Sequence, residues 1–386
     1  MFNHNRLMQK ENEILNEENQ KLLHLVKMAQ ERVKELSGSL QNSKVSILPP
    51  ITVCNELVES NGQKKSEKYT SFFDAVGKVS LSSIPLTLCD GPLVAVGESN
   101  GSISLWDFNT LKCNQNMLSL YRFRFQESSD ANIGPIKKAS QPLTGHEGPV
   151  TSVKWVNDSS LSTVSLDSTL KIWDIETGEN QSFYTSVPAV SHASIESSIL
   201  VASCTKNLVS IDVRDPNPTI MEMNTPITAV ASTSLGILLG TSTGSLLLFD
   251  PRTNKTYQSI QVSTAQLPIS KISGTKNITV TSFDGIVRQI GNELPIYVQK
   301  EYARSPTNGS IIGSCCVSLA SEEFVISGST IGKAVIWKSS KYVQTLQHSG
   351  NIVYDCIPLN NYVGAFVTCD NSKQMTMYAR SFDQFV

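Results

Sequence analysis

Residues 170–174 read LKIWD, and a second copy of this strand ending, ISLWD, stands at residues 103–107. Weaker copies end at positions 211, 249, 290, 337 and 378. Counted from Trp173, the intervals between copies are 38, 38, 41, 47 and 41 residues. A period of about 40 to 45 residues, with four strands in each unit, is typical of propeller blades. Seven copies therefore predict an all-β, seven-bladed β-propeller over residues 67–380, with a tail at 381–386.

The interval from Trp106 to Trp173 is 67 residues, so the sequence predicts an insertion near residues 114–142. Basic and aromatic residues alternate within it, at Tyr121, Arg122, Phe123 and Arg124. On a strand this alternation places the rings on one face and the arginines on the other. Two interpretations remain open. The segment forms the outer strand of the first blade, or it contacts a partner, because Arg and aromatic residues are enriched in binding hot spots.

The best repeat carries His146, Ser165, Asp167 and Trp173. With these residues the sequence resembles the WD-repeat family, and the resemblance covers roughly residues 67–380. It implies a hydrogen-bonded set in which Asp167 pairs with His146, while the Ser165 hydroxyl and the Trp173 indole complete the chain. Such a set satisfies buried polar groups and pins a loop to its blade.

The other repeats carry this pattern in diluted form. Asn100 stands six residues before Trp106, and Asp284 stands six residues before Ile290. Asp167 precedes Trp173 by the same distance. In the last repeat His348 matches His146, but Tyr378 replaces the Trp and Ser372 stands where the Asp is expected. We therefore expect these blades to depend mainly on apolar packing.

The last repeat supplies only three strand-like runs before the chain ends. An open sheet edge there would expose unpaired backbone groups. The segment Lys68–Phe73 precedes the first repeat, and the family resemblance implies that the two ends of the chain share one blade. We therefore expect this segment to supply the missing outer strand.

Residues 1–40 follow a heptad pattern, with no Pro and no Gly before Gly38. Leu at d with Val at a favours two parallel strands, and Asn at a selects a dimer while lowering stability. The sequence predicts a parallel homodimeric coiled coil, followed by a linker at 41–66. A helix that pairs with a different chain, or docks on the domain behind it, remains an alternative. The predicted seam consists of Met8, Asn12, Leu15, Asn19, Leu22, Val26, Ala29, Val33 and Leu36.

Composition narrows the class of protein. The 386 residues are 40% hydrophobic and 17% charged with a formal charge of −2, so no basic field for nucleic acid or anionic lipid is expected. No apolar run approaches the ~20 residues of a membrane span. The eight cysteines form no CxxC pair and lie mostly in apolar runs, which predicts buried, reduced thiols and a cytoplasmic or nuclear protein.

Two motifs match catalytic or nucleotide-binding patterns only in their letters. Residues 240–244 fit the GxSxG pattern, but a strand follows where the nucleophile motif needs a helix. Residues 328–333 resemble a phosphate-binding loop, yet Ala334 replaces the required Ser or Thr. The five histidines are dispersed. We therefore expect no catalytic residues, no metal and no cofactor.

A fold by itself does not determine a function, so the prediction depends on the absence of a chemical site in the sequence. We expect a non-catalytic protein–protein interaction scaffold that dimerises through the coiled coil and presents propeller surfaces to protein partners. The alternative is a subunit of a fixed hetero-complex whose N-terminal helix pairs with a different chain. The architecture resembles G-protein beta subunits and splicing, corepressor and autophagy-type adaptors. Nucleic acid is expected to be reached only indirectly.

Overall fold

The computed structural model describes residues 72–108, 137–139, 141–195, 198–202, 205–212, 217–303, 305–319, 322–360 and 362–380. The chain divides into two compact units, Met1–Lys68 and Tyr69–Val386, and all described residues belong to the second. The regular elements of this described part are all strands, and it holds no helix long and apolar enough to cross a bilayer.

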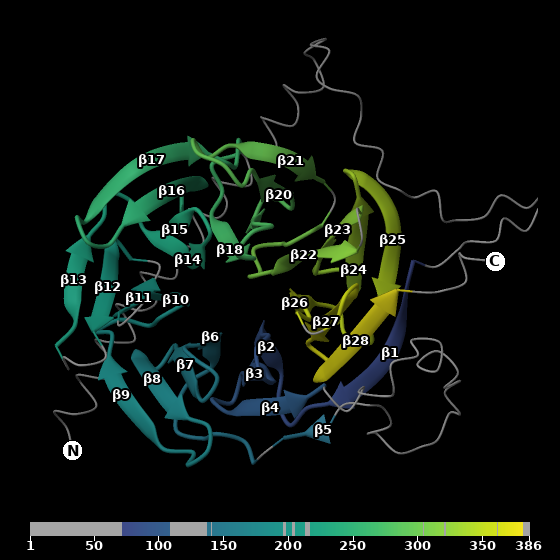
Figure 1. Ribbon diagram of the computed structural model, residues 1–386, viewed down its shortest axis with the longest axis horizontal. Helices are drawn as coiled ribbons and strands as arrows, with labels where there is room; N and C mark the ends of the chain where they lie inside the picture. Colours follow the sequence, from purple (N-terminus) through teal and green to yellow (C-terminus); the bar gives the residue numbers. More distant parts are fainter. Residues whose placement is uncertain are drawn as a thin grey trace, which may run out of the picture. The chain divides into compact units, whose positions relative to one another are not determined.

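The described strands form seven four-stranded antiparallel sheets. Figure 1 shows the sheets of this unit side by side around a central axis, with one edge strand of each sheet nearest the centre. Blades 1 to 3 are built from β2 (Pro85–Cys89), β3 (Val94–Glu98), β4 (Ile103–Asp107) and β5 (Lys137–Lys138); β6 (Val150–Trp155), β7 (Ser160–Ser165), β8 (Thr169–Asp174) and β9 (Asn180–Tyr184); and β10 (Ser191–Ile195), β11 (Ser198–Ala202), β12 (Asn207–Asp212) and β13 (Thr219–Glu222).

The remaining blades follow the same order, except that the last combines both ends of the unit. Blade 7 has the strand order β1-β28-β27-β26. Blades 4 to 7 are built from β14 (Ile227–Thr233), β15 (Gly236–Thr241), β16 (Ser245–Asp250) and β17 (Lys255–Gln261); β18 (Ile269–Ser273), β19 (Thr279–Ser282), β20 (Val287–Ile290) and β21 (Val298–Tyr302); β22 (Ser314–Leu319), β23 (Glu322–Ser327), β24 (Lys333–Lys338) and β25 (Lys341–Gln347); and β26 (Val353–Pro358), β27 (Ala365–Asp370), β28 (Gln374–Arg380) and β1 (Phe73–Ser80).

The predicted fold class, a seven-bladed propeller preceded by a coiled coil, needs correction. Six sheets have four strands of four residues or more, whereas β5 in blade 1 has only two residues. Among the described residues, the outer edge of β4 pairs with Lys137 and Lys138 and is bridged to Leu143, so the outer strand of blade 1 is short. The fold supported is an all-β propeller with six full blades and one reduced blade. The described residues contain no helix, and the predicted coiled coil at 1–40 and linker at 41–66 lie outside them.

The ring closes through β1, which pairs with β28 from Phe73↔Arg380 to Ser80↔Gln374. The closing strand is therefore Phe73–Ser80, several residues beyond the predicted Lys68–Phe73. The alternation along the strand buries Phe73 and Val79. Gln344 of blade 6 holds the start of β1, because its Oε1 accepts from the N–H groups of Phe72 and Phe73 at 2.9 and 3.0 Å.

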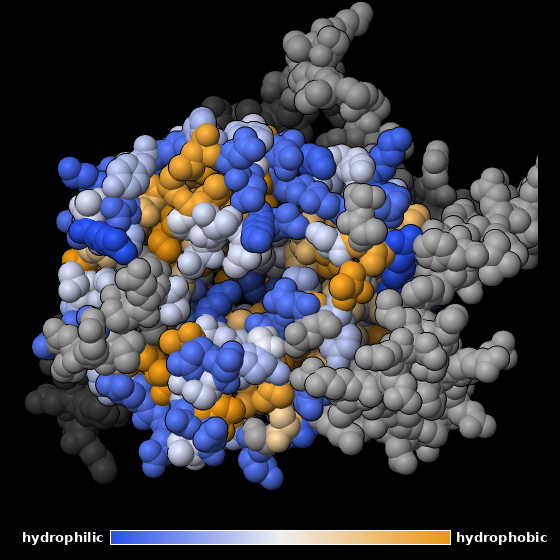
Figure 2. Space-filling view, in the orientation of Figure 1, coloured by the Kyte–Doolittle hydropathy of each residue, from blue (hydrophilic) through white to orange (hydrophobic). Residues whose placement is uncertain are grey.

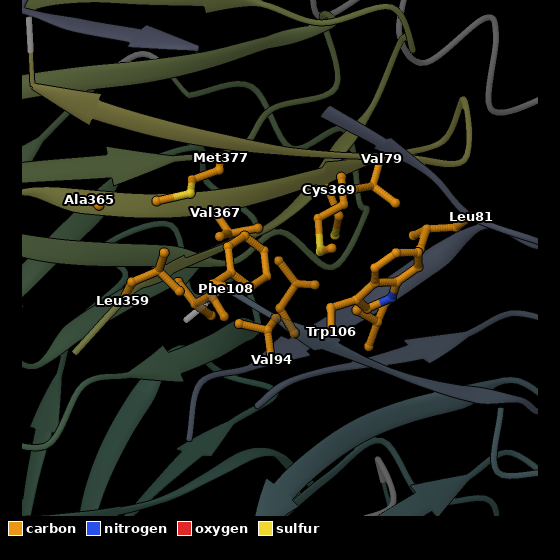
Figure 3. Packing of buried hydrophobic residues seen from close by; sticks show 14 residues of the cluster. Val79, Leu81, Val94, Trp106, Phe108, Leu359, Ala365, Val367, Cys369 and Met377 are labelled. Atoms are coloured by element: carbon orange, nitrogen blue, oxygen red, sulfur yellow. The ribbon is translucent and has the colours of Figure 1, made fainter. Parts of the chain in front are cut away.

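The core lies between the blades. Figure 3 shows the cluster between blades 7 and 1, where Val79 and Met377 face Val94 and Trp106. The indole of Trp106 is 6% exposed. Aliphatic and aromatic side chains of neighbouring sheets form comparable clusters around the ring, so burying the blade faces also fixes the neighbours.

Hydroxyls on the innermost strands also join neighbouring blades. The strand register shifts at Thr151, Thr228 and Ser270, and a bulge of this kind re-aims the extra side chain. Thr151 donates to the Ala189 carbonyl at 2.7 Å, Thr228 to Ile269 at 2.6 Å and Ser270 to Ile312 at 2.9 Å. Each acceptor belongs to the next blade or the loop leading into it.

An ion pair crosses the centre of the ring. Lys271 of β18 reaches Asp355 of β26, two blades away, and the Asp355 carboxylate also accepts from the N–H of Leu88 in β2 at 2.8 Å. Gly313 lies between them, because a Cβ at that position would come within 2.0 Å of Asp355 Oδ1. The missing side chain therefore lets blades 5, 7 and 1 meet at the axis. Figure 2 shows hydrophilic residues around this central opening.

Candidate interaction surface

The two ends of the ring carry different loops. Because strands alternate in direction within each sheet, the blade-to-blade loops and the turns between second and third strands share one end, which we call face A. The remaining turns share the opposite end, face B. The hydrogen-bonded set expected from the sequence lies beneath face A and positions its loops.

Blade 2 contains a continuous chain of side-chain hydrogen bonds. His146 Nδ1 lies 2.9 Å from Asp167 Oδ2, and His146 Nε2 lies 2.7 Å from Thr163 Oγ1. The Trp173 indole N–H donates to the same Thr163 hydroxyl at 2.8 Å. The Asp167 carboxylate also accepts from the Glu147 N–H at 3.0 Å. The blade 1–2 loop is thereby tied to the β7–β8 turn.

The sequence-based prediction named the wrong hydroxyl in this chain. Ser165 Oγ accepts from the Asp167 N–H at 3.1 Å and belongs to the turn, whereas Thr163 joins His146 to Trp173. Side chains two residues apart on a strand share a face. The sequence pattern therefore could not separate the two positions, and only the strand register selects Thr163.

Burial lowers the pKa of His146, although its hydrogen bond and charge interaction with Asp167 oppose the shift. For Asp167, burial alone would raise the pKa, but hydrogen bonds from Thr169 and His146 outweigh it and the pKa is lowered. Asp167 is therefore an anion at neutral pH. A neutral His146 can still donate to it from Nδ1 and accept from Thr163 at Nε2.

Blade 7 builds a related set from differently placed residues. His348 Nδ1 lies 3.2 Å from Asp370 Oδ2, and His348 Nε2 lies 3.3 Å from Thr368 Oγ1 and 3.5 Å from the Tyr378 hydroxyl. Asp370 ends the second strand of its blade, as Ser165 does in blade 2, and Ser372 occupies the place of Asp167. The Ser372 N–H donates to Asp370 at 2.8 Å. The Ser-x-Asp order of blade 2 has become Asp-x-Ser.

Blades 1 and 5 use other charged groups. In blade 1 the buried Glu98 accepts from Ser104 and Ser82, each at 2.8 Å, and the Trp106 indole donates to Ser104 at 3.0 Å. In blade 5 Arg288 is 1% exposed and bridges Asp284 and Glu301 at 2.9 and 2.8 Å. These two blades therefore do not depend on apolar packing alone.

His192 joins blades 2 and 3. The Ser162 hydroxyl donates to the Lys154 carbonyl at 3.0 Å, so it accepts from His192 Nε2, which lies 3.0 Å away. Complete burial lowers the pKa of this histidine to about 3. The ring is consequently neutral at physiological pH.

Apolar side chains emerge on face A at blades 5 and 6. Leu267, Ile311 and Ile331 are 39%, 48% and 50% exposed, and we call these three residues the apolar rim. Exposed ionisable side chains in the described face A loops are confined to Glu147, Lys206 and Lys373.

Hydrogen bonds join the loops of the apolar rim in series. The Phe283 N–H donates to Pro268 at 2.9 Å, Thr307 donates to the Phe283 carbonyl at 3.0 Å, and the Thr330 N–H donates to Pro306 at 2.8 Å. The apolar side chains are therefore presented by fixed loops. Such an uncharged, pre-organised surface can bind a protein partner with little loss of conformational entropy.

The predicted partner contacts Tyr121, Arg122, Phe123 and Arg124 lie outside the described residues. The outer edge of β4, where they were expected as a strand, is paired with β5 at Trp106↔Lys138 and bridged to Leu143 at Ile103. Both interpretations of that segment, as an outer strand or as a partner contact, stay predictions. The predicted seam residues of the coiled coil also lie outside the described part.

No group of three or more His, Cys, Asp or Glu side chains that could hold a metal ion is found in the described ranges. Cys315, Cys356 and Cys369 are buried free thiols whose pKa values are raised well above the usual range by burial. Their reactivity is correspondingly low.

The apolar rim could not be predicted from the sequence, because its residues come from separate loops.

Residues 137–174 match the family model described as WD domain, G-beta repeat. Curated relatives include ribosome biogenesis protein WDR12 homologues of Drosophila mojavensis, 27% identical over 110 residues, and Ixodes scapularis, 32% identical over 83 residues. These matches cover 25% and 21% of this chain and 25% and 20% of the relatives, so at most about a quarter of each relative is spanned.

A solved structure gives a broader match, at the level of the fold. The crystal structure of the Myceliophteria thermophila Cps50 (Swd1) β-propeller domain aligns with a TM-score of 0.63 at 15% identity. The alignment covers 80% of this chain and all of that domain. It supports the propeller architecture.

Proposed function

Because the chain belongs to the WD-repeat β-propeller family, we propose that it is a non-catalytic scaffold that binds protein partners through the apolar rim of face A. The observation that carries the proposal is the exposure of Leu267, Ile311 and Ile331 on hydrogen-bonded loops. Apolar side chains on a rigid support are the groups that supply most binding energy in protein interfaces. The scarcity of charge around them means that a partner buries few unpaired ions.

We further propose that the assembly served is nuclear and concerns ribosome biogenesis. The support is the name shared by the curated relatives, two of which match this chain over 110 and 96 residues. RNA is reached through the protein partners, because the described loops of face A present only two exposed basic side chains, Lys206 and Lys373.

The test compares tagged full-length chain with the variant Ile311→Asp/Ile331→Asp. Both side chains are about half exposed, so the fold should tolerate the change, and Ile220→Asp on β13, 51% exposed, is the matched control. We expect wild type and control to co-sediment with pre-ribosomal particles. The co-sedimenting fraction of the rim variant should be at least about tenfold smaller. Co-sedimentation of the rim variant at the wild-type level would refute the role of the rim. Absence of wild-type chain from these particles would refute the ribosomal assignment.

A further inference from the structure

A second surface lies on face B, where blades 4 and 5 meet. Ser234 of the β14–β15 turn donates through its N–H to Thr275 at 2.8 Å and through its hydroxyl to Asn292 at 2.7 Å. Three face B turns therefore contact one another. We call this region the blade 4–5 corner; its apolar residues are Leu235, Leu294 and Tyr297.

Hydrogen bonds hold the β20–β21 loop of this corner in one conformation. Gln258 of β17 accepts from the Ile296 N–H at 2.7 Å and donates to the Ile296 carbonyl at 2.8 Å. The Gly291 N–H donates to the Tyr297 carbonyl at 3.0 Å. The loop is thus fixed both to itself and to the neighbouring blade.

The fixed loop presents two large apolar side chains. Leu294 is 61% exposed and Tyr297 is 46% exposed. The Tyr297 ring lies against the backbone of Gly291, since a Cβ there would come within 2.3 Å of it. A side chain that is already ordered loses little entropy when it binds, so both have the properties of interface anchors.

The charges around the corner are mainly positive. Lys255 and Lys276 are exposed on its blade 4 and blade 5 sides, against one exposed carboxylate, Glu293, in the described turns. The nearby Asp250 carboxylate is also charged, but the guanidinium of the exposed Arg252 interacts with it and offsets its charge. The charge of the corner therefore complements an anionic ligand.

We propose that the blade 4–5 corner binds an acidic segment of a protein partner that carries an apolar anchor residue. The anchor packs against Leu294 and Tyr297, and flanking Asp or Glu residues lie near Lys255 and Lys276. This surface is independent of the apolar rim and lies at the opposite end of the ring. One chain can therefore hold two proteins at once.

The experiment measures fluorescence anisotropy of labelled peptides with the full chain at low salt. The probes are the synthetic peptide DEDLFDED, the same peptide with Ser-Gly in place of Leu-Phe, and KRKLFKRK. We expect DEDLFDED to bind at least about tenfold tighter than either comparison peptide. Equal binding of the basic peptide, or no saturable binding of DEDLFDED, would overturn the proposal.

Variants of the full chain locate the site. Leu294→Ser/Tyr297→Ser and Lys255→Glu/Lys276→Glu should each weaken binding of DEDLFDED at least about tenfold. Ile311→Asp/Ile331→Asp should leave it unchanged, which separates this surface from the apolar rim. All substituted side chains are exposed, so unchanged thermal midpoints verify the fold. Binding that survives both corner variants would place the peptide elsewhere and contradict the assignment.

Discussion

Blades 2 and 7 perform the same structural task with residues in different places. Blade 2 takes all four strands from one stretch of chain and carries its carboxylate in the turn, at Asp167. Blade 7 joins the two ends of the unit and carries its carboxylate on the strand, at Asp370, whose side chain is 1% exposed against 10% for Asp167. The hydrogen-bonded partner, a histidine that faces a threonine, is the same. Both blades therefore bring together a carboxylate, an imidazole and a threonine hydroxyl. The carboxylate, however, comes from a different position of the repeat in each blade.

The largest effect should come from the closing strand of blade 7. Phe73 is 1% exposed and its ring lies edge-on to Phe324 and Phe366, with centroids 5.1 and 5.2 Å away. Phe73→Ala should lower the free energy of unfolding by about 3–5 kcal/mol. Urea denaturation measures this value, and Val76→Ala, at the half-buried bulge of β1, should cost much less. Equal losses for the two variants would show that closure does not depend on the Phe73 anchor.

The second effect concerns the two carboxylates. Removing a partner of a buried charged hydrogen bond costs about 1.5–3 kcal/mol or more, and the cost increases with burial. We expect Asp370→Ala to lie near 3 kcal/mol and Asp167→Ala near 1.5 kcal/mol, both measured by urea denaturation. A larger loss for Asp167→Ala would reverse the comparison.

Acid should lower the free energy of unfolding through His192, which joins blades 2 and 3. Its pKa in the folded protein is about 3, below the ordinary value of 6.5, so at intermediate pH the unfolded chain binds the extra proton. The stabilisation is present above pH 6.5 and is lost as the pH falls towards 3. We expect a loss of about 2 kcal/mol between pH 7 and pH 5. Equilibrium unfolding across this range measures it, and His192→Gln should flatten the slope. An unaltered slope in the variant would assign the acid sensitivity to other groups.

The smallest net change in the free energy of unfolding should come from exchanging Asp370 and Ser372 in blade 7. Asp370→Ser alone removes the anion next to His348 and destabilises the protein. Adding Ser372→Asp restores the blade 2 order, so the double variant should unfold within about 1 kcal/mol of wild type. Thermal and urea unfolding of the single and double variants test this. No recovery in the double variant would mean that blade 7 requires the carboxylate on the strand.

Most of the hydrogen-bonded set of blade 2 could be predicted from the sequence of a single repeat. Asp167, His146 and Trp173 are recognisable because a local pattern of turn, strand and anchor repeats along the chain. The assignment of the hydroxyl to Ser165 failed, since residues 163 and 165 share one strand face.

The amino-acid sequence determined the all-β class and the spacing of the blades, because strand endings are local patterns of apolar residues and turns. Tertiary structure decided the rest. The reduced outer strand of blade 1, the substitution of Asp370 for the missing turn Asp, and the meeting of Lys271 with Asp355 all depend on segments far apart in the chain. The same holds for the apolar rim and the blade 4–5 corner, whose residues lie in separate loops. Closure of the ring brings these segments together, and no local pattern in the sequence predicts such contacts.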